Sequence, residues 1–250
     1  MIGVRQDGGV AVLTMAHGKA NALDIEFCTA LADRFDALRT APAKAIILTA
    51  EGKIFSAGVD LKRLSEEGPA YVRRFLPTLH RLYEAVFFHP KPVVAAINGH
   101  AVAGGCVLAA CADRRIMAQG NARVGVTELL VGVPFPALAF EVVRSVVPPR
   151  FLSEVTYSGA TYDTDMALDR GWIDEVVESE DLMEDALAVA DELAELSPAA
   201  FALTKQQLRA PVRERLDAGG AATEAAATDI WCADDTLKRV RDYVAKTLRK

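Results

Sequence analysis

Two segments of the sequence follow the same plan, and this internal repeat constrains the fold more than any other feature. The first is IILTAEGKIFSAGVDL, from residue 46, and the second is VVAAINGHAVAGGCVL, from residue 93. Each predicts a strand, a glycine turn, a short second strand and a small-residue turn that opens a helix; Gly52 matches Gly99, and Gly58 matches Gly105. The repeat predicts a supersecondary unit that coils on itself rather than a doubly wound sheet.

Strands and helices alternate through the first two thirds of the chain. β-branched runs predict strands at 10–15, 45–50, 93–97 and 115–118, and amphipathic patterns predict helices at 24–38 and 71–88. This alternation predicts an α/β fold. Beyond Pro148-Pro149, from Leu182 onward, the pattern is helical, with segments at 181–196, 198–208, 212–227 and 234–248. We expect a core with the active site over 1–190 and a C-terminal helical subdomain over 191–250 that serves packing and association.

Composition limits the partners of the chain. Half of the 250 residues are hydrophobic, but the longest nearly uncharged stretch, 129–140, is interrupted by glycine and proline, so no membrane span is expected. The start lacks a secretory signal pattern, which favours a cytoplasmic protein. A net charge of −6 argues against nucleic acid as a partner. The basic segment 238–250 is expected to be a solvated helix face, with a phosphate-bearing ligand or a neighbouring subunit as the alternative.

Several familiar sites are excluded because their side chains are missing. The segment GHAVAGGC has the glycine spacing of a phosphate loop but no following Lys-Ser/Thr, and G-x-S-x-G, H-E-x-x-H and a well-placed G-x-G-x-x-G are absent. The four cysteines include no C-x-x-C pair, so neither zinc nor a disulfide framework is indicated. The four histidines are scattered and are expected to be structural; His80, which precedes the glycine-rich turn, is the strongest exception.

Four blocks carry the chemistry: KANALD from Lys19, FSAGVDLK from Phe55, AAINGHAVAGGC from Ala95, and VGVTE, which ends at Glu128. In this order and at these distances they resemble the enoyl-CoA hydratase/isomerase (crotonase) family, over about residues 10–177. The resemblance implies a crotonase spiral of ββα units with a helical C-terminal part, assembled as a homotrimer or a hexamer. It also implies an acyl-CoA thioester as substrate; coenzyme A is then part of the substrate, and neither a separate cofactor nor a metal is expected.

The resemblance also implies the roles of individual residues. The backbone N–H groups of Val59 and Gly104 would stabilise the negative charge that develops on the thioester oxygen when a neighbouring proton is removed. Such a donor is worth about 3–4 kcal/mol. The acyl pocket would include Val107, Leu108 and Phe135, for which core packing is an equal alternative. Contacts to substrate or CoA would come from Lys19, Ala20, Ala22, Ser56, Ala57, Gly58, Asp60, Leu61 and Lys62, with solvent exposure as the alternative for the two lysines.

The reaction is indicated by one departure from the hydratase pattern. Hydratases of the family carry two glutamates, whereas this chain has Val107 at the first position and Glu128 at the second. Adding water needs a group that activates the water and a source of the proton, whereas moving a double bond needs a single carboxylate. The segments TELLVGVPFP and LTK, the latter at residues 203–205, also resemble the isomerases.

We therefore expect a Δ3-to-Δ2 enoyl-CoA isomerase of fatty-acid metabolism in which Glu128 is the acid/base, with a pKa raised by burial. The alternatives are a hydratase or dehydratase of the same fold, or an acyl-CoA-binding protein without catalysis. For the site, the alternative is that Glu128 lies on the surface, forms a salt bridge and has no catalytic role. In the last helix, Leu237-Lys238 departs from the Glu-Gly usual in the family, which leaves the contacts of that helix open.

Overall fold

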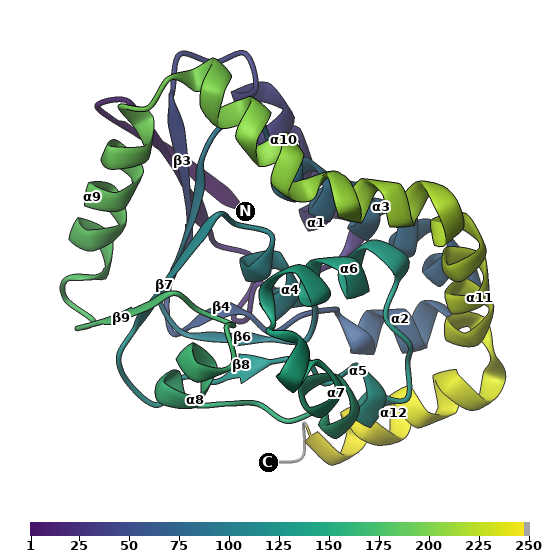
Figure 1. Cartoon of the computed structure of the whole chain (residues 1–250). Coiled ribbons are helices and arrows are strands. Elements are labelled where there is room, and N and C mark those ends of the chain that lie inside the picture. The colour runs from purple at the N-terminus through teal and green to yellow at the C-terminus, as the bar shows by residue number, and fades with distance from the viewer. Residues whose placement is uncertain (248–250) are drawn as a thin grey trace.

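The computed structural model describes residues 1–247, which build two stacked sheets wrapped by helices (Figure 1). The larger sheet has the order β1-β2-β3-β5-β7-β9, and all of its neighbouring strands are parallel except β1 and β2. The smaller sheet has the order β4-β6-β8 and is parallel. The strands are β1 Ile2–Asp7, β2 Val10–Met15, β3 Ala45–Ala50, β4 Ile54–Ser56, β5 Val93–Ile97, β6 His100–Val102, β7 Arg114–Ala118, β8 Val124–Gly125 and β9 Glu175–Val177.

The internal repeat of the sequence is visible in the strand pairing. Each of the pairs β3–β4, β5–β6 and β7–β8 gives one strand to the large sheet and the next to the small sheet. The two echoing segments lie side by side, with Ile46 opposite Val93 in the large sheet and Ile54 opposite His100 in the small one. The predicted α/β spiral of repeated units is therefore confirmed.

Helices cover both faces of the large sheet. The described helices are α1 Ile25–Leu38, α2 Leu61–Glu67, α3 Pro69–Phe87, α4 Gly104–Ala110, α5 Glu128–Val131, α6 Ala137–Val146, α7 Pro149–Ser158, α8 Thr164–Asp169, α9 Leu182–Ala194, α10 Pro198–Arg215, α11 Ala221–Cys232 and α12 Asp234–Thr247. Residues spaced four apart on α9, from Leu182 to Ala194, pack on one face of the sheet against Val12, Ile47 and Val94. The opposite face packs against α1 and α3 in the main core.

One expected helix boundary in the C-terminal third differs from the structure. The sequence predicts separate helices at 198–208 and 212–227, but α10 runs through Pro211 to Arg215 and continues into a π-helical turn, Leu216–Gly220. The tertiary contacts on both sides of the proline, an ion pair of Arg209 with Asp113 and the burial of Val212, outweigh the hydrogen bond that proline cannot form. Residue 190, the expected boundary between the two parts, lies inside α9.

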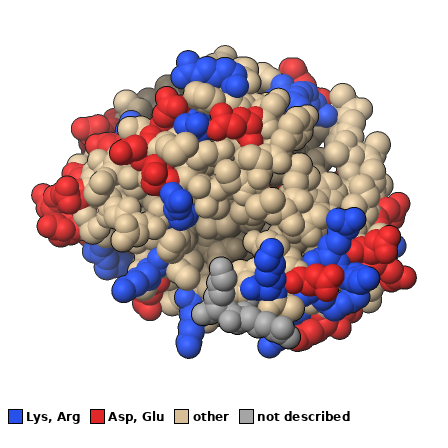
Figure 2. Space-filling view, turned by 90° about the horizontal axis from the view of Figure 1, so that it is seen from below, with Lys and Arg blue, Asp and Glu red and all other residues tan. Residues whose placement is uncertain are grey.

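The surface carries charges of both signs. Viewed from below, acidic and basic side chains are interspersed around a broad uncharged region, and no single sign dominates this face (Figure 2). Within residues 1–247, no helix is both long and apolar enough to cross a bilayer. The basic segment expected at 238–250 forms the end of α12 as far as Thr247, and its last three residues lie outside the described part of the chain.

Candidate active site

A cavity of about 340 Å³ lies where the two repeat units meet the C-terminal helices. It brings together the two predicted backbone donors, Val59 and Gly104, the predicted base Glu128, and Val107. The rest of the lining is largely apolar and comes from several helices; it includes Leu61, Leu79, Tyr83, Val131, Val133, Pro136, Ala139, Trp231 and Tyr243. The arrangement is an apolar chamber with a small number of polar groups in its wall.

The first polar feature of the wall is a close approach of two backbone turns. Gly58 has φ +82°, a conformation that favours glycine, and a Cβ there would lie 2.8 Å from the carbonyl oxygen of Val102 and 3.0 Å from the nitrogen of Gly104. The turn that follows β4 and the start of α4 therefore touch, and only a glycine permits this contact. The two repeated segments of the sequence therefore lie in direct contact at their turns.

Both turns present a free backbone donor. Leu23 pairs with Val59 as a parallel bridge, in which the Leu23 N–H donates to Gly58 and the Leu23 carbonyl accepts from Asp60. The N–H of Val59 therefore points away from Leu23. Gly104 is the first residue of α4, so its N–H has no partner within the helix. Within residues 1–247, no hydrogen bond is formed by either N–H.

The Gly104 donor is held by a strained residue. Ala103, the cap of α4, has φ 50° and ψ −128°, values that residues with a Cβ rarely adopt. Its N–H donates to Gly125 in β8 at 2.8 Å, and its carbonyl accepts from Cys106 and Val107 in the first turn of α4. Strain of this kind persists only where the surroundings fix it, and it concentrates at functional sites.

The one carboxylate in the described lining belongs to Glu128, the first residue of α5. The residue is buried, and its Oε2 has no hydrogen-bond partner within the described residues. Burial raises the pKa of Glu128 to about 7, against the opposing effect of the nearby backbone N–H groups of residues 127 and 128. A carboxyl with this pKa can both accept and return a proton near neutral pH. Val107, the residue by which the sequence departs from the hydratase pattern, lines the same cavity.

Two of the residues predicted to contact substrate or CoA, Ala57 and Leu61, line the cavity. Lys19 and Lys62 are exposed, and Ala20 and Ala22 are half-buried. The carbonyl of Ala20 accepts from the N–H of Ala57, and Asp60 caps α2 through the N–H of Arg63.

Ser56 differs from the prediction. Its side chain is fully buried, donates to the carbonyl of Asn21 at 2.8 Å and accepts from the N–H of Gly58. The Ser56 hydroxyl therefore fixes the turn that precedes Val59, and Ser56 is not part of the cavity lining.

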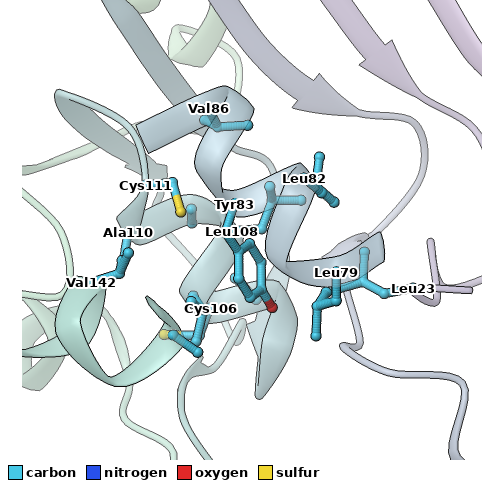
Figure 3. Close-up of a cluster of buried hydrophobic side chains, with 14 of the residues drawn as sticks. Leu23, Leu79, Leu82, Tyr83, Val86, Cys106, Leu108, Ala110, Cys111 and Val142 are labelled. Atoms are coloured by element: carbon cyan, nitrogen blue, oxygen red, sulfur yellow. The ribbon is translucent and has the colours of Figure 1, made fainter. Parts of the chain in front are cut away.

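Two of the three predicted acyl-pocket walls also lie elsewhere. Leu108 follows Val107 by one residue, a rotation of about 100° around α4, and packs in the core cluster (Figure 3). Phe135 lines a separate groove that also includes Phe140 and Tyr157. The position of Leu108 around α4 directs its side chain away from the cavity. Phe135 lies in the segment after α5, which places its side chain in the other groove.

The sequence did not predict the cavity-lining residues that come from distant helices. Tyr83 comes from α3, Trp231 from α11 and Tyr243 from α12. The indole N–H of Trp231 donates to the carbonyl of Pro134 at 2.9 Å and so fixes the segment after α5. Among the histidines, His100 lines the cavity, whereas His80 does not belong to its lining. No local motif marks these positions, because they meet only in the folded chain.

Comparisons with known proteins agree with this geometry. The model of the enoyl-CoA hydratase/isomerase family matches residues 5–247. A putative enoyl-CoA hydratase of Thermus thermophilus is 34% identical over 210 residues, which are 82% of this chain and 82% of that protein. A carnitinyl-CoA dehydratase of Salmonella typhi is 33% identical over 215 residues, or 84% and 82% of the two chains.

The human mitochondrial delta3-delta2-enoyl-CoA isomerase has a similar crystal structure, with a TM-score of 0.94 and 26% identity over 99% of this chain and 98% of that one. Hydratase, dehydratase and isomerase names therefore all occur among the similar proteins. What these proteins share is the family and its fold. The chain belongs to the enoyl-CoA hydratase/isomerase (crotonase) family.

Proposed function

We propose that the protein is a Δ3-to-Δ2 enoyl-CoA isomerase in which Glu128 is the single acid/base. The observation that carries the proposal is a lone buried carboxylate that lines the same apolar cavity as Val107, together with two unpaired backbone donors. Within the described lining, no second carboxylate is present to activate a water molecule.

In the first step, the thioester oxygen of a 3-enoyl-CoA accepts hydrogen bonds from the N–H groups of Val59 and Gly104. The Glu128 carboxylate removes a proton from C2, and the electrons of that C–H bond move onto the thioester oxygen to give a dienolate. The two donors stabilise the charge that develops on this oxygen more than they stabilise the neutral ester.

In the second step, protonated Glu128 returns the proton to C4. The electrons flow back from the oxygen, the double bond moves from C3–C4 to C2–C3, and the carboxylate is regenerated. The apolar lining suits this step, because it favours the neutral carboxylic acid during the life of the dienolate. No water and no redox partner are consumed.

Substrate binding follows from the same geometry. CoA would run along the turn at Lys19 to Ala22 and the segment Ala57 to Lys62, and the acyl chain would enter the apolar chamber between α3 and α12. We also propose a homotrimer or a hexamer, as the resemblance implies, acting in fatty-acid metabolism in the cytoplasm.

The direct test is an assay of purified protein with a 3-enoyl-CoA and, separately, with a 2-enoyl-CoA. The 3-enoyl substrate should be converted to the 2-enoyl product without 3-hydroxyacyl-CoA. In Glu128→Gln the rate should fall by two to four orders of magnitude, the usual worth of a general acid/base. Turnover that survives in Glu128→Gln would remove Glu128 as the base.

A hydratase or dehydratase is the second candidate, and it is favoured by the printed names of the relatives from Thermus thermophilus and Salmonella typhi. It would need a water molecule held by groups other than Glu128. Rapid formation of 3-hydroxyacyl-CoA from the 2-enoyl substrate would establish this function in place of the isomerase. CoA binding without any turnover would indicate an acyl-CoA-binding protein.

A further inference from the structure

Tyr83 is a buried polar residue that the mechanism above does not use. It lies on α3 and is 1% exposed, and its ring stands between Leu79 and Cys106 in the core cluster (Figure 3). The same side chain reaches the wall of the cavity. A tyrosine in such a position needs a hydrogen-bond partner for its hydroxyl.

The partner is the residue that carries one of the two proposed donors. The Tyr83 hydroxyl donates to the carbonyl oxygen of Gly104 at 2.9 Å. A Cβ on Gly104 would lie 2.9 Å from the Tyr83 oxygen and 3.1 Å from Leu23. Glycine at this position is therefore required by the close packing of the tyrosine, since the φ of Gly104 itself lies in the ordinary range.

The contact acts on a strained part of the backbone. The peptide that joins Ala103 to Gly104 follows the strained φ of Ala103, and the Gly104 N–H is part of that peptide. The two neighbouring peptides are both held: the N–H of Ala103, in the preceding peptide, donates to Gly125 in β8, and the carbonyl of Gly104, in the following peptide, accepts from Tyr83 on α3. Without one of these supports, the peptide can relax toward a common conformation.

We propose that Tyr83 is a positioning residue that aims the Gly104 N–H at the thioester oxygen. The inference rests on the proposed enolate chemistry and adds a residue to it. Burial keeps the pKa of Tyr83 well above its usual range, so the hydroxyl remains a donor throughout the pH range in which Glu128 titrates. Because Tyr83 acts through Gly104, its contribution should appear in the stabilisation of the oxyanion and not in the binding of the neutral ester.

The variant Tyr83→Phe tests the proposal, because it keeps the ring and removes only the hydroxyl. With a 3-enoyl-CoA, kcat should fall on the order of ten- to a hundredfold, the usual cost of a misaligned catalytic group, while KM changes less than about twofold. The second readout uses a 3-oxoacyl-CoA, whose acidic C2 lets the bound enolate be titrated by its ultraviolet absorbance. The enolate affinity should weaken by a similar factor, while the affinity for a saturated acyl-CoA stays unchanged.

Tyr71→Phe is the matched control. Tyr71 lies on the same helix and is fully buried, and its hydroxyl accepts from the N–H of Ile25 at 3.3 Å. This variant should lose stability without a change in the ratio of enolate to acyl-CoA affinity. Equal loss of both affinities in Tyr83→Phe, or kinetics like those of the wild type, would overturn the proposal. The comparison of enolate affinity with acyl-CoA affinity does not depend on isomerase turnover, so a failed function and a failed positioning role can be told apart.

Discussion

The Glu128 side chain combines two properties that seldom occur together, burial and the lack of a charged partner. No ion pair is formed by Glu128 within the described residues, so desolvation alone accounts for the rise of its pKa to about 7. A carboxyl that changes protonation near neutrality therefore lines the same cavity as the aliphatic side chain of Val107. Residues that perform catalysis commonly have pKa values that burial has shifted.

The pKa of Glu128 predicts a pH dependence of activity. Because the base must be ionised in the free enzyme, kcat/KM for a 3-enoyl-CoA should fall as pH drops below about 7. A profile measured from pH 5 to pH 9 should show a single acidic limb with its midpoint near 7. A midpoint near the ordinary value of 4.5 would show that the base is a solvated carboxylate.

The raised pKa of Glu128 also affects the stability of the fold. Activity should increase as the pH rises, whereas stability should decrease. The folded state binds a proton more tightly than the unfolded state, so Glu128 costs stability as pH rises from about 4.5 through 7. Glu128→Gln, which stays neutral, should be more stable than the wild type at pH 8 by about 3 kcal/mol and nearly equal to it at pH 4.5. Urea unfolding at the two pH values measures this difference.

At the scale of elements, the site depends on how closely β4, α4 and the turn after β4 approach one another. Gly58 touches Gly104, and a Cβ on Gly105 would lie 2.3 Å from the carbonyl oxygen of Ser56. The repeat in the sequence supplies small residues at both turns, so two units can meet with their backbones in contact. The pair of backbone donors is therefore positioned by close contact of the main chain, which requires glycine at these turns.

Gly58→Ala tests this close approach, with Gly52→Ala as the control. Both glycines have φ near +80°, but a Cβ at Gly52 has nothing within 4 Å, whereas one at Gly58 collides with Val102 and Gly104. Both variants should lose about 1–2 kcal/mol of stability from backbone strain. Only Gly58→Ala should lose about 1–3 kcal/mol more from overpacking, together with most of kcat. Equal effects of the two substitutions would contradict the account.

Local sequence patterns predict the strands and part of the site, but not the contacts between distant segments. The strands at 10–15, 45–50 and 93–97 have the predicted bounds, since their patterns are local. Val59, Gly104 and Glu128 lie in short motifs whose own backbone builds the site. Tyr83 and Trp231 meet the cavity only through packing between distant segments, and no local pattern encodes that meeting. Leu108 and Val107 are neighbours on α4, and their side chains point in different directions around the helix. The family resemblance does not specify which of the two lines the cavity.

At the scale of the whole molecule, a buried ion cluster ties α10 to the sheet. Asp113 pairs with Lys205 and with Arg209, each at 2.6 Å, and its Oδ2 accepts from the N–H of Val93. Arg209 also stacks over the ring of Phe87, 4.0 Å from its centroid. The three charged side chains are at most 15% exposed. The cluster fixes the start of the C-terminal helices, two of which close the cavity with Trp231 and Tyr243.

Asp113→Asn should therefore destabilise the fold strongly, because it leaves two buried cations without a counter-charge. The expected loss is about 3 kcal/mol in urea unfolding. Asp33→Asn is the matched control: Asp33 pairs with Arg81 at the same 2.6 Å, but both side chains are largely exposed, so the loss should stay below about 1 kcal/mol. Similar losses in the two variants would show that burial of the cluster is not what matters.

The central claim is that one carboxyl moves one proton from C2 to C4. The measurement that tests it most directly is turnover of a 3-enoyl-CoA deuterated at C2, with the position of the label followed by NMR. Because Glu128 is buried in an apolar cavity, part of the label should appear at C4 of the 2-enoyl product, and none of the product should be 3-hydroxyacyl-CoA. Complete loss of the label to solvent before C4 is protonated, or a 3-hydroxyacyl product, would contradict the claim.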